Sequence, residues 1–318
     1  MRRTVYVHCG LHKTGTTAIQ AAFDERRPWL RAKGVLYPVS QDGNNAHHNL
    51  AWEIAGDRRF DPAALTIADA VAQIAAFDGD AVLSSEDFES FLHRPQALAP
   101  LLQPLRAAGH QVSLVIYFRE RRSYARSLYT ELLRHGYAAT FDEFLAEIEA
   151  NGMLQYREWV FQFAYRRVRA ALAAYQDARL VPRRYDAATR SGSVVADLLP
   201  LLGLPADLLG EAARQVRHER DPLACTVARF MANRVGRALT VSECQTIARL
   251  LRQAEALDGA SGPPRRLAQF CSTETAAAVE ALAVSPSLQA EQALLHWWRM
   301  PARQSLAQRW KSARHWWA

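Results

Sequence analysis

Near its start the chain reads Val5-Tyr6-Val7-His8-Cys9-Gly10-Leu11-His12-Lys13-Thr14-Gly15-Thr16-Thr17, which joins a short apolar run to a loop with two glycines. The apolar run predicts a buried strand over 4–8, and a helix is expected over about 15–26. A strand, a glycine-bearing loop and a helix N-terminus together form an anion site, because backbone N–H groups and the helix dipole point at one place. The stretch therefore predicts a phosphate site.

The residue types in this loop suit that purpose. Lys13 supplies a mobile positive charge, and Gly15 lets the backbone approach an anion closely. Thr16 and Thr17 offer hydroxyl donors in the first helical turn. His12 abuts the loop, where it either orients the loop or only fills space. The plain alternative is an ordinary helix N-terminus with threonines.

The loop differs from the nucleoside-triphosphate loop, whose pattern is G-x-x-x-x-G-K-[ST]. Gly10 and Gly15 have the required separation, but Thr16 occupies the lysine position and the lysine lies inside the loop as Lys13. A kinase or ATPase would lose the charge that reaches the β- and γ-phosphates. The loop therefore predicts a phosphate cradle with a different chemistry.

A second candidate phosphate site follows the apolar run 112–118, which predicts a strand ending at Arg119. Ser127 comes eight residues later, on a stretch expected to be helical over 120–135. An arginine at the end of a parallel strand and a serine two turns into the next helix can converge on one phosphate. The alternative is a solvated basic helix face. Further arginines crowd the same stretch: Arg121, Arg122 and Arg126.

Together these two elements carry a resemblance. Residues 13–17, Lys13-Thr14-Gly15-Thr16-Thr17, resemble the 5′-phosphosulfate loop of the sulfotransferases that use 3′-phosphoadenosine 5′-phosphosulfate (PAPS), and Arg119 with Ser127 resembles their 3′-phosphate site. The resemblance covers about residues 1–200. It implies PAPS as donor, PAP as product and no metal. Tyr185-Asp186 resembles the segment of that family whose tyrosine lies near the adenine, although it departs from the full pattern.

Transfer to a hydroxyl also requires a proton acceptor. Glu86 follows the short apolar strand 81–83, where members of that family place a histidine or a glutamate. We therefore expect Glu86 to be the general base, with Lys13 stabilising the leaving phosphate. A glutamate base resembles the glycosaminoglycan sulfotransferases more than the small-molecule ones. The alternative is that Ser84 or Ser85 caps a short helix, with Glu86 and Asp87 as favourable first-turn acids.

Residues 44–49, Asn44-Asn45-Ala46-His47-His48-Asn49, form another polar cluster. They could line the acceptor cleft or have a structural or surface role. Adjacent histidines point to different sides of any regular element, so His47 and His48 are not expected to bind one ligand together. With His12, they are the candidate substrate contacts.

The organisation of the chain predicts an α/β fold, a P-loop-type parallel sheet flanked by helices with a mostly helical C-terminal part. Strands are expected near 4–8, 81–83, 112–118 and 178–182, with 35–38 extended. Helices are expected near 63–77, 97–108, 120–135, 141–150, 155–176 and 192–202, and a short one lies between Pro28 and Gly34. Strands that alternate with helices favour a parallel sheet covered on both faces. We divide the chain into a PAPS-binding core, 1–205, and a helical region, 206–318, expected to pack on it.

Composition narrows the setting. The chain has 318 residues and a formal net charge of +7. It contains neither an apolar leader pattern nor a run of roughly 20 apolar residues that could span a membrane. Its four cysteines are scattered without a C-x-x-C pair, which favours reduced thiols and a cytoplasmic location. No zinc or calcium ligand spacing is visible, and the basic excess is too local for a nucleic-acid partner.

Much of the excess of basic over acidic residues lies in the last twenty residues. Residues 299–318 contain five basic residues and no acidic one, and five of the eight tryptophans lie within 297–317. Leu306, Trp310, Ala313 and Trp317 fall on one helical face. Such a helix either docks on the protein body, which we favour, or lies on an anionic membrane.

The sequence thus predicts a cytoplasmic sulfotransferase that moves a sulfuryl group from PAPS to a hydroxyl or amine, on a saccharide or a lipid. Two alternatives stay open. One is a P-loop kinase or nucleotide hydrolase, and the other is a noncatalytic PAP-binding protein.

Overall fold

The computed structural model describes residues 3–135, 137, 139 and 141–206. These residues fall into two compact units. One contains residues 3–124 and 147–206, and the other contains residues 125–146. The predicted helical region 206–318 and its tryptophan-rich end lie almost wholly outside the described residues. Within the described part of the chain, no helix has the length and apolarity needed to cross a bilayer.

The first unit is built on a five-stranded sheet in the order β2-β3-β1-β4-β7. Every neighbouring pair of strands is parallel. The strands are β1 Thr4–His8, β2 Val35–Leu36, β3 Asp80–Ser84, β4 Gln111–Phe118 and β7 Arg179–Arg184. The central strands are apolar runs whose side chains are buried on both faces, as parallel sheets require. The predicted α/β class is confirmed.

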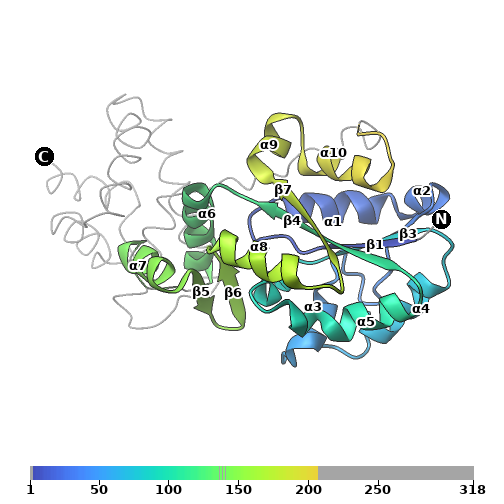
Figure 1. Ribbon diagram of the computed structural model, residues 1–318, viewed down its shortest axis with the longest axis horizontal. Coiled ribbons are helices and arrows are strands. Elements are labelled where there is room, and N and C mark those ends of the chain that lie inside the picture. The colour runs from blue at the N-terminus through green and yellow to red at the C-terminus, as the bar shows by residue number, and fades with distance from the viewer. Residues whose placement is uncertain (1–2, 136, 138, 140, 207–318) are drawn as a thin grey trace, which may run out of the picture. The chain divides into compact units, whose positions relative to one another are not determined.

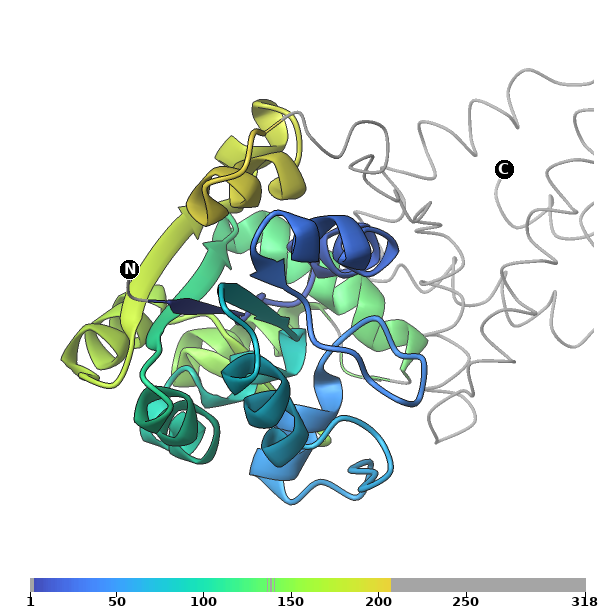
Figure 2. The same ribbon diagram turned by 90° about the vertical axis from the view of Figure 1, so that its right-hand side faces the viewer.

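Helices cover both faces of this sheet (Figures 1 and 2). One face carries α1 Thr16–Glu25, α2 Arg27–Ala32, α9 Tyr185–Arg190 and α10 Val194–Leu198. The other carries α3 His48–Ala55, α4 Ile67–Ala75, α5 Ala99–Ala107 and α8 Tyr165–Ala174. The core on the α1 side joins Ile19 and Phe23 of α1 to Val115 of β4 and Val195 of α10.

The chain leaves neighbouring strands toward opposite faces. The connection after β1 runs through α1 on one face, whereas the connection after β3 runs through α5 on the other (Figure 1). In open parallel sheets, such a reversal leaves a crevice outside the carboxyl ends of the two strands, where ligands bind. The loop after His8 and the segment after Ser84 both lie at this edge.

The other elements of the described residues are three 3₁₀ helices, two α-helices and one hairpin. They are the 3₁₀ helices η1 Glu86–Phe91, η2 Pro95–Leu98 and η3 Leu199–Leu202, the helices α6 Arg121–Arg134 and α7 Phe141–Asn151, and the strands β5 Met153–Tyr156 and β6 Trp159–Gln162. Residues 125–134 of α6 and the first part of α7 belong to the second unit.

The predicted helix over 155–176 is wrong in its first part. Residues 153–162 form an antiparallel hairpin, and the helix α8 covers only Tyr165–Ala174. Tyr156 pairs with Trp159, so the turn has two residues, and Arg157 adopts a φ of 54° there. Aromatic residues suit a pleated surface, and this local preference outweighed the helical pattern. The helices α3 and α9 were not predicted.

Candidate active site

The loop after β1 is tightly curled. Lys13 has a φ of 63° and Gly15 a φ of 81°, so two residues adopt the left-handed conformation within three positions. This conformation is uncommon for a residue with a side chain and carries strain. Thr14 is buried, and its hydroxyl donates to the carbonyl of Leu11 at 2.5 Å. Thr14 therefore shapes the loop from inside.

The loop ends at a helix N-terminus that no described side chain caps. Gly15 is the N-cap residue of α1, and the first turn holds no acidic residue. Thr16 is only 5 % exposed, and its Oγ1 has no hydrogen-bond partner among the described residues. Thr17 is exposed. A helix N-terminus without a side-chain cap, its dipole and an unpartnered hydroxyl together favour an anion at this point.

The loop has no room for a side chain at either of its two glycines. A Cβ on Gly10 would lie 2.5 Å from Oγ1 of Thr16, and a Cβ on Gly15 would lie 2.8 Å from Val194. Gly15 is doubly constrained because its positive φ also disfavours a side chain. A side chain at either position would therefore have to displace Thr16 or Val194.

Arg119 reaches this loop from the end of β4. Its Nη1 donates to the carbonyl of Lys13 at 2.7 Å, and its Nε donates to the hydroxyl of Ser123 at 3.0 Å. Its guanidinium also lies 5.0 Å from the ring centroid of Tyr185. The first unit thus brings three predicted residues together at the loop. They are Lys13, Arg119 and Tyr185.

Ser127 is buried on α6, within residues 125–146 of the second unit. The convergence of Ser127 with Arg119 on one phosphate stays a prediction.

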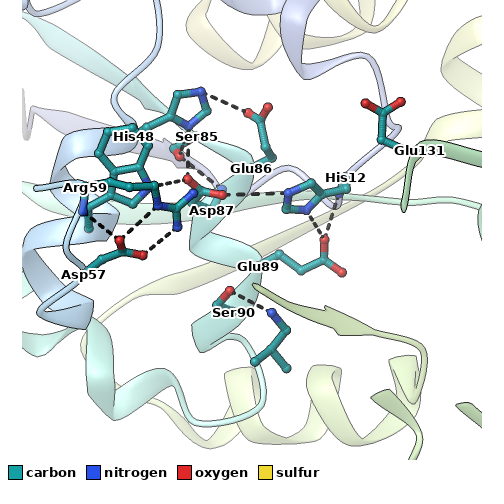
Figure 3. Close-up of polar contacts among 12 residues, drawn as sticks. His12, His48, Asp57, Arg59, Ser85, Glu86, Asp87, Glu89, Ser90 and Glu131 are labelled. Carbon is teal, nitrogen blue, oxygen red and sulfur yellow. Dashed lines mark hydrogen bonds and ion pairs between the residues drawn. The ribbon is translucent and has the colours of Figure 1, made fainter. Parts of the chain in front are cut away.

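Glu86 begins the 3₁₀ helix η1 at the carboxyl end of β3 (Figure 3). Its side chain is 22 % exposed, and Oε2 accepts a hydrogen bond from Gln20 of α1 at 2.9 Å. Burial by itself would raise the pKa of Glu86, but the charges of His48 and His12 and the hydrogen bond from Gln20 outweigh it and lower the pKa. The lowered pKa favours the ionised form of this carboxylate.

The capping alternative is also present at this helix. The hydroxyl of Ser85 accepts from the backbone N–H of Asp87 at 3.1 Å, so Ser85 is the N-cap and Glu86 is a first-turn acid. Capping and an accessible carboxylate coexist here, because the cap uses Ser85 and leaves the side chain of Glu86 facing Gln20.

The adjacent histidines diverge, as expected. His47 is buried, with Nε2 at 3.1 Å from the carbonyl of Pro38 and Nδ1 accepting from the N–H of Ser84 at 2.9 Å. Burial lowers the pKa of His47 to about 4, so this residue is a neutral structural group. His48 instead faces the acidic segment. Its Nδ1 lies 2.9 Å from Oγ of Ser85, and its Nε2 lies 3.9 Å from Oε2 of Glu86.

Glu89 is a site residue that sequence reasoning missed. Its side chain has no exposed surface, and it bonds the backbone N–H and the Nδ1 of His12, each at 2.8 Å. It also accepts from the hydroxyl of Tyr124 and from the N–H of Gln162. The available signal was an acid set between Phe88 and Phe91, which an apolar environment would enclose.

His8 was also missed. This last residue of β1 is fully buried, and its Nδ1 lies 2.9 Å from Oγ of Ser84 on the neighbouring strand. Its Nε2 has no partner among the described residues, and it would lie 3.2 Å from a Cβ on Gly10. Burial lowers the pKa of His8 to about 4, so the imidazole next to Gly10 is neutral.

Comparison of the chain with protein-family models, with curated proteins and with solved structures found no match. Among the described residues, no group of three or more histidine, cysteine, aspartate or glutamate side chains is arranged to hold a metal ion.

Proposed function

We propose that the protein is a P-loop-type sulfotransferase that transfers a sulfuryl group from PAPS to a hydroxyl or amine. The observation that carries the proposal is the contact of Arg119 with the loop. A guanidinium from the end of β4 bonds the carbonyl of Lys13 and lies over the ring of Tyr185. A basic group and an aromatic ring therefore adjoin an uncapped helix N-terminus, a combination suited to a nucleotide with two separated phosphate groups.

The residues present fit such a nucleotide. The unpartnered Oγ1 of Thr16 and the backbone N–H groups in the first turn of α1 would hold the 5′-phosphosulfate. Arg119 would bind the 3′-phosphate together with Ser127, and Tyr185 would contact the adenine. PAPS supplies the activated sulfuryl group when bound.

The catalytic roles follow from position. Glu86 lies at the carboxyl end of β3, next to the strand that carries the loop, and would accept the proton of the acceptor hydroxyl. Lys13 lies within the loop and would stabilise the charge that develops on the departing phosphate oxygen. Because the bond to the acceptor oxygen forms as the bond to the phosphate oxygen breaks, the two charges arise at opposite ends of one transfer.

The acceptor in this proposal is a saccharide or a lipid. A glutamate base resembles the enzymes that act on glycosaminoglycans, which favours the saccharide. A cytoplasmic location also belongs to this proposal.

Calorimetry with purified protein tests the proposal against its two alternatives. PAP should bind without Mg²⁺ and more tightly than ATP, because Thr16 replaces the lysine that a triphosphate site needs. Tight binding of ATP only with Mg²⁺ would instead support a kinase or hydrolase. Tight PAP binding with no release of PAP from PAPS, even with candidate acceptors, would support a noncatalytic binding protein.

A further inference from the structure

Two buried polar atoms beside the loop, Nε2 of His8 and Oγ1 of Thr16, have no hydrogen-bond partner within the described part of the chain. His8 is 0 % exposed and Thr16 is 5 % exposed. A Cβ on Gly10 would lie 3.2 Å from Nε2 of His8 and 2.5 Å from Oγ1 of Thr16, so both atoms border the same point. Because a buried polar atom without a partner is costly, two such atoms at one point are expected to satisfy each other.

The imidazole of His8 is held by the strands on both sides of β1. Its Nδ1 lies 2.9 Å from Oγ of Ser84 on β3, and the carbonyl of His8 accepts from the N–H of Ser85 at 3.2 Å. The ring of Tyr117 on β4 packs edge-on against it, at 5.7 Å between centroids. The sheet therefore sets the direction of Nε2, and that direction leads toward Gly10 and Thr16.

The position of one proton decides what this arrangement can do. Burial lowers the pKa of His8 to about 4, so the ring is neutral and carries a single N–H. If the hydroxyl of Ser84 donates to Nδ1, that proton lies on Nε2, which can donate to Oγ1 of Thr16. A hydroxyl can accept one hydrogen bond and donate another, so Thr16 keeps its own proton for an anion. The opposite tautomer would take the proton of Thr16 away from the anion.

We propose that His8 is a positioning residue of the loop: with an anion bound, its Nε2–H donates to Oγ1 of Thr16, whose own proton then points at an oxygen of the anion. The donors run in one direction, from Ser84 at the end of β3 through His8 to Thr16 in the first turn of α1. Gly10 lacks a side chain at the point where His8 and Thr16 meet. The inference rests on the proposed function, in which the anion is the 5′-phosphosulfate of the donor.

The direction of the donors is tested by NMR on protein with ¹⁵N-labelled histidine. Spectra that correlate the ring nitrogens with the carbon-bound ring protons show which nitrogen of His8 bears the proton. The signals are assigned by their loss in His8→Gln. With inorganic phosphate bound, the proton should lie on Nε2. A proton on Nδ1 overturns the proposal, because Thr16 would then donate to His8 instead of to the anion.

The action of His8 through Thr16 is tested by the affinities of variants for inorganic phosphate and for PAP. Thr16→Val removes the hydroxyl and should weaken both ligands about 10-fold, and His8→Leu, which removes both ring nitrogens, should approach that loss. The double variant should bind no more weakly than Thr16→Val alone. His8→Gln, whose amide nitrogen can replace Nε2, should restore most of the affinity. His110→Leu is the control, since His110 is a buried histidine that precedes β4 at the other end of the sheet.

The outcomes separate the role of His8 from the proposed function. Losses that add in the double variant, or equal affinities of His8→Leu and the wild type, overturn the role of His8. If His8→Leu does not fold, the position of the proton in the wild type decides. Wild type that binds phosphate but not PAP contradicts the use of PAPS and leaves the role of His8 intact. Tight PAP binding that His8→Leu does not weaken contradicts only the role of His8.

Discussion

Two segments leave the sheet side by side, and they are built in opposite ways. The loop of residues 9–15 after β1 ends at a helix that no described side chain caps and whose first turn holds no acid. The segment 85–91 after β3 is capped by Ser85 and carries three acidic residues in its first turn. The helix that ends the first segment has no side-chain cap that would compete with an anion, whereas the second segment is capped by its own Ser85 and carries one partly exposed carboxylate, that of Glu86. A group-transfer site needs a cradle that binds the donor nucleotide and a base that takes the proton from the acceptor molecule.

The second segment contains a finer contrast of the same kind. Glu86 and Glu89 are three residues apart on one 3₁₀ helix, yet their surroundings differ. Glu86 is partly exposed and accepts one hydrogen bond from Gln20, whereas Glu89 is enclosed and accepts bonds from His12, Tyr124 and Gln162. Glu89 is thus tied into the fold by its contacts, whereas Glu86, the proposed base, stays partly exposed.

The largest effect is expected for Glu86→Gln. The amide keeps the size of the side chain but cannot accept a proton, so PAPS-dependent turnover should fall by roughly 10²–10⁴-fold. The affinity for PAP and the melting temperature should stay near those of the wild type. Release of PAP from PAPS, with an acceptor or as slow hydrolysis without one, gives the rate.

Glu25→Gln is the matched control for this substitution, because Glu25 is an exposed glutamate at the far end of α1. It should leave the rate unchanged. A near wild-type rate in Glu86→Gln eliminates Glu86 as the base and directs attention to His12 and His48.

Glu89→Gln should lower the stability of the protein, whereas Glu86→Gln should lower its turnover. An amide has one oxygen and one NH₂ group, and each oxygen of Glu89 accepts from at least two donors. In either orientation the NH₂ group therefore faces donors, and a buried charge partner of His12 is lost. Breaking a buried network of this kind costs about 3–5 kcal/mol of unfolding free energy, roughly 10 °C in melting temperature.

Thermal unfolding of Glu89→Gln beside Glu86→Gln sharpens the contrast between the two carboxylates. If both variants melt together with the wild type, Glu89 does not hold the site, and the distinction drawn between the two glutamates fails.

The sequence predicted the first of the two segments better than the second. The strand, loop and helix of residues 4–25 are contiguous, so local apolarity and the glycines were sufficient to predict them. Glu86 was singled out because it comes shortly after a predicted strand, and its role as base stays a prediction. The role of Glu89 depends on Tyr124 and Gln162, which are distant in sequence. Gln162 also belongs to a hairpin whose residues were predicted as helix, so no local pattern could reveal that contact.

Arg119 illustrates the same limit at the first segment. Its place at the end of a strand was predicted, since the apolar run 112–118 is unambiguous. Its hydrogen bond to the carbonyl of Lys13 and its position over Tyr185 were not, because they depend on the strand order of the sheet. The residue type of Arg119 suggested a phosphate contact. The strand order of the sheet determines which side chains Arg119 meets.

The most direct test of the account is the affinity for PAP and for AMP, which lacks the 3′-phosphate, measured by calorimetry in wild type, Arg119→Ala and Arg122→Ala. Wild type should prefer PAP by about 10–150-fold, the equivalent of about 1.5–3 kcal/mol for a charge-assisted phosphate contact. Arg119→Ala should lose most of this preference, whereas Arg122→Ala, which alters an exposed arginine at the start of α6, should keep it. Equal affinity of the wild type for PAP and AMP would contradict the 3′-phosphate site and, with it, the proposed use of PAPS.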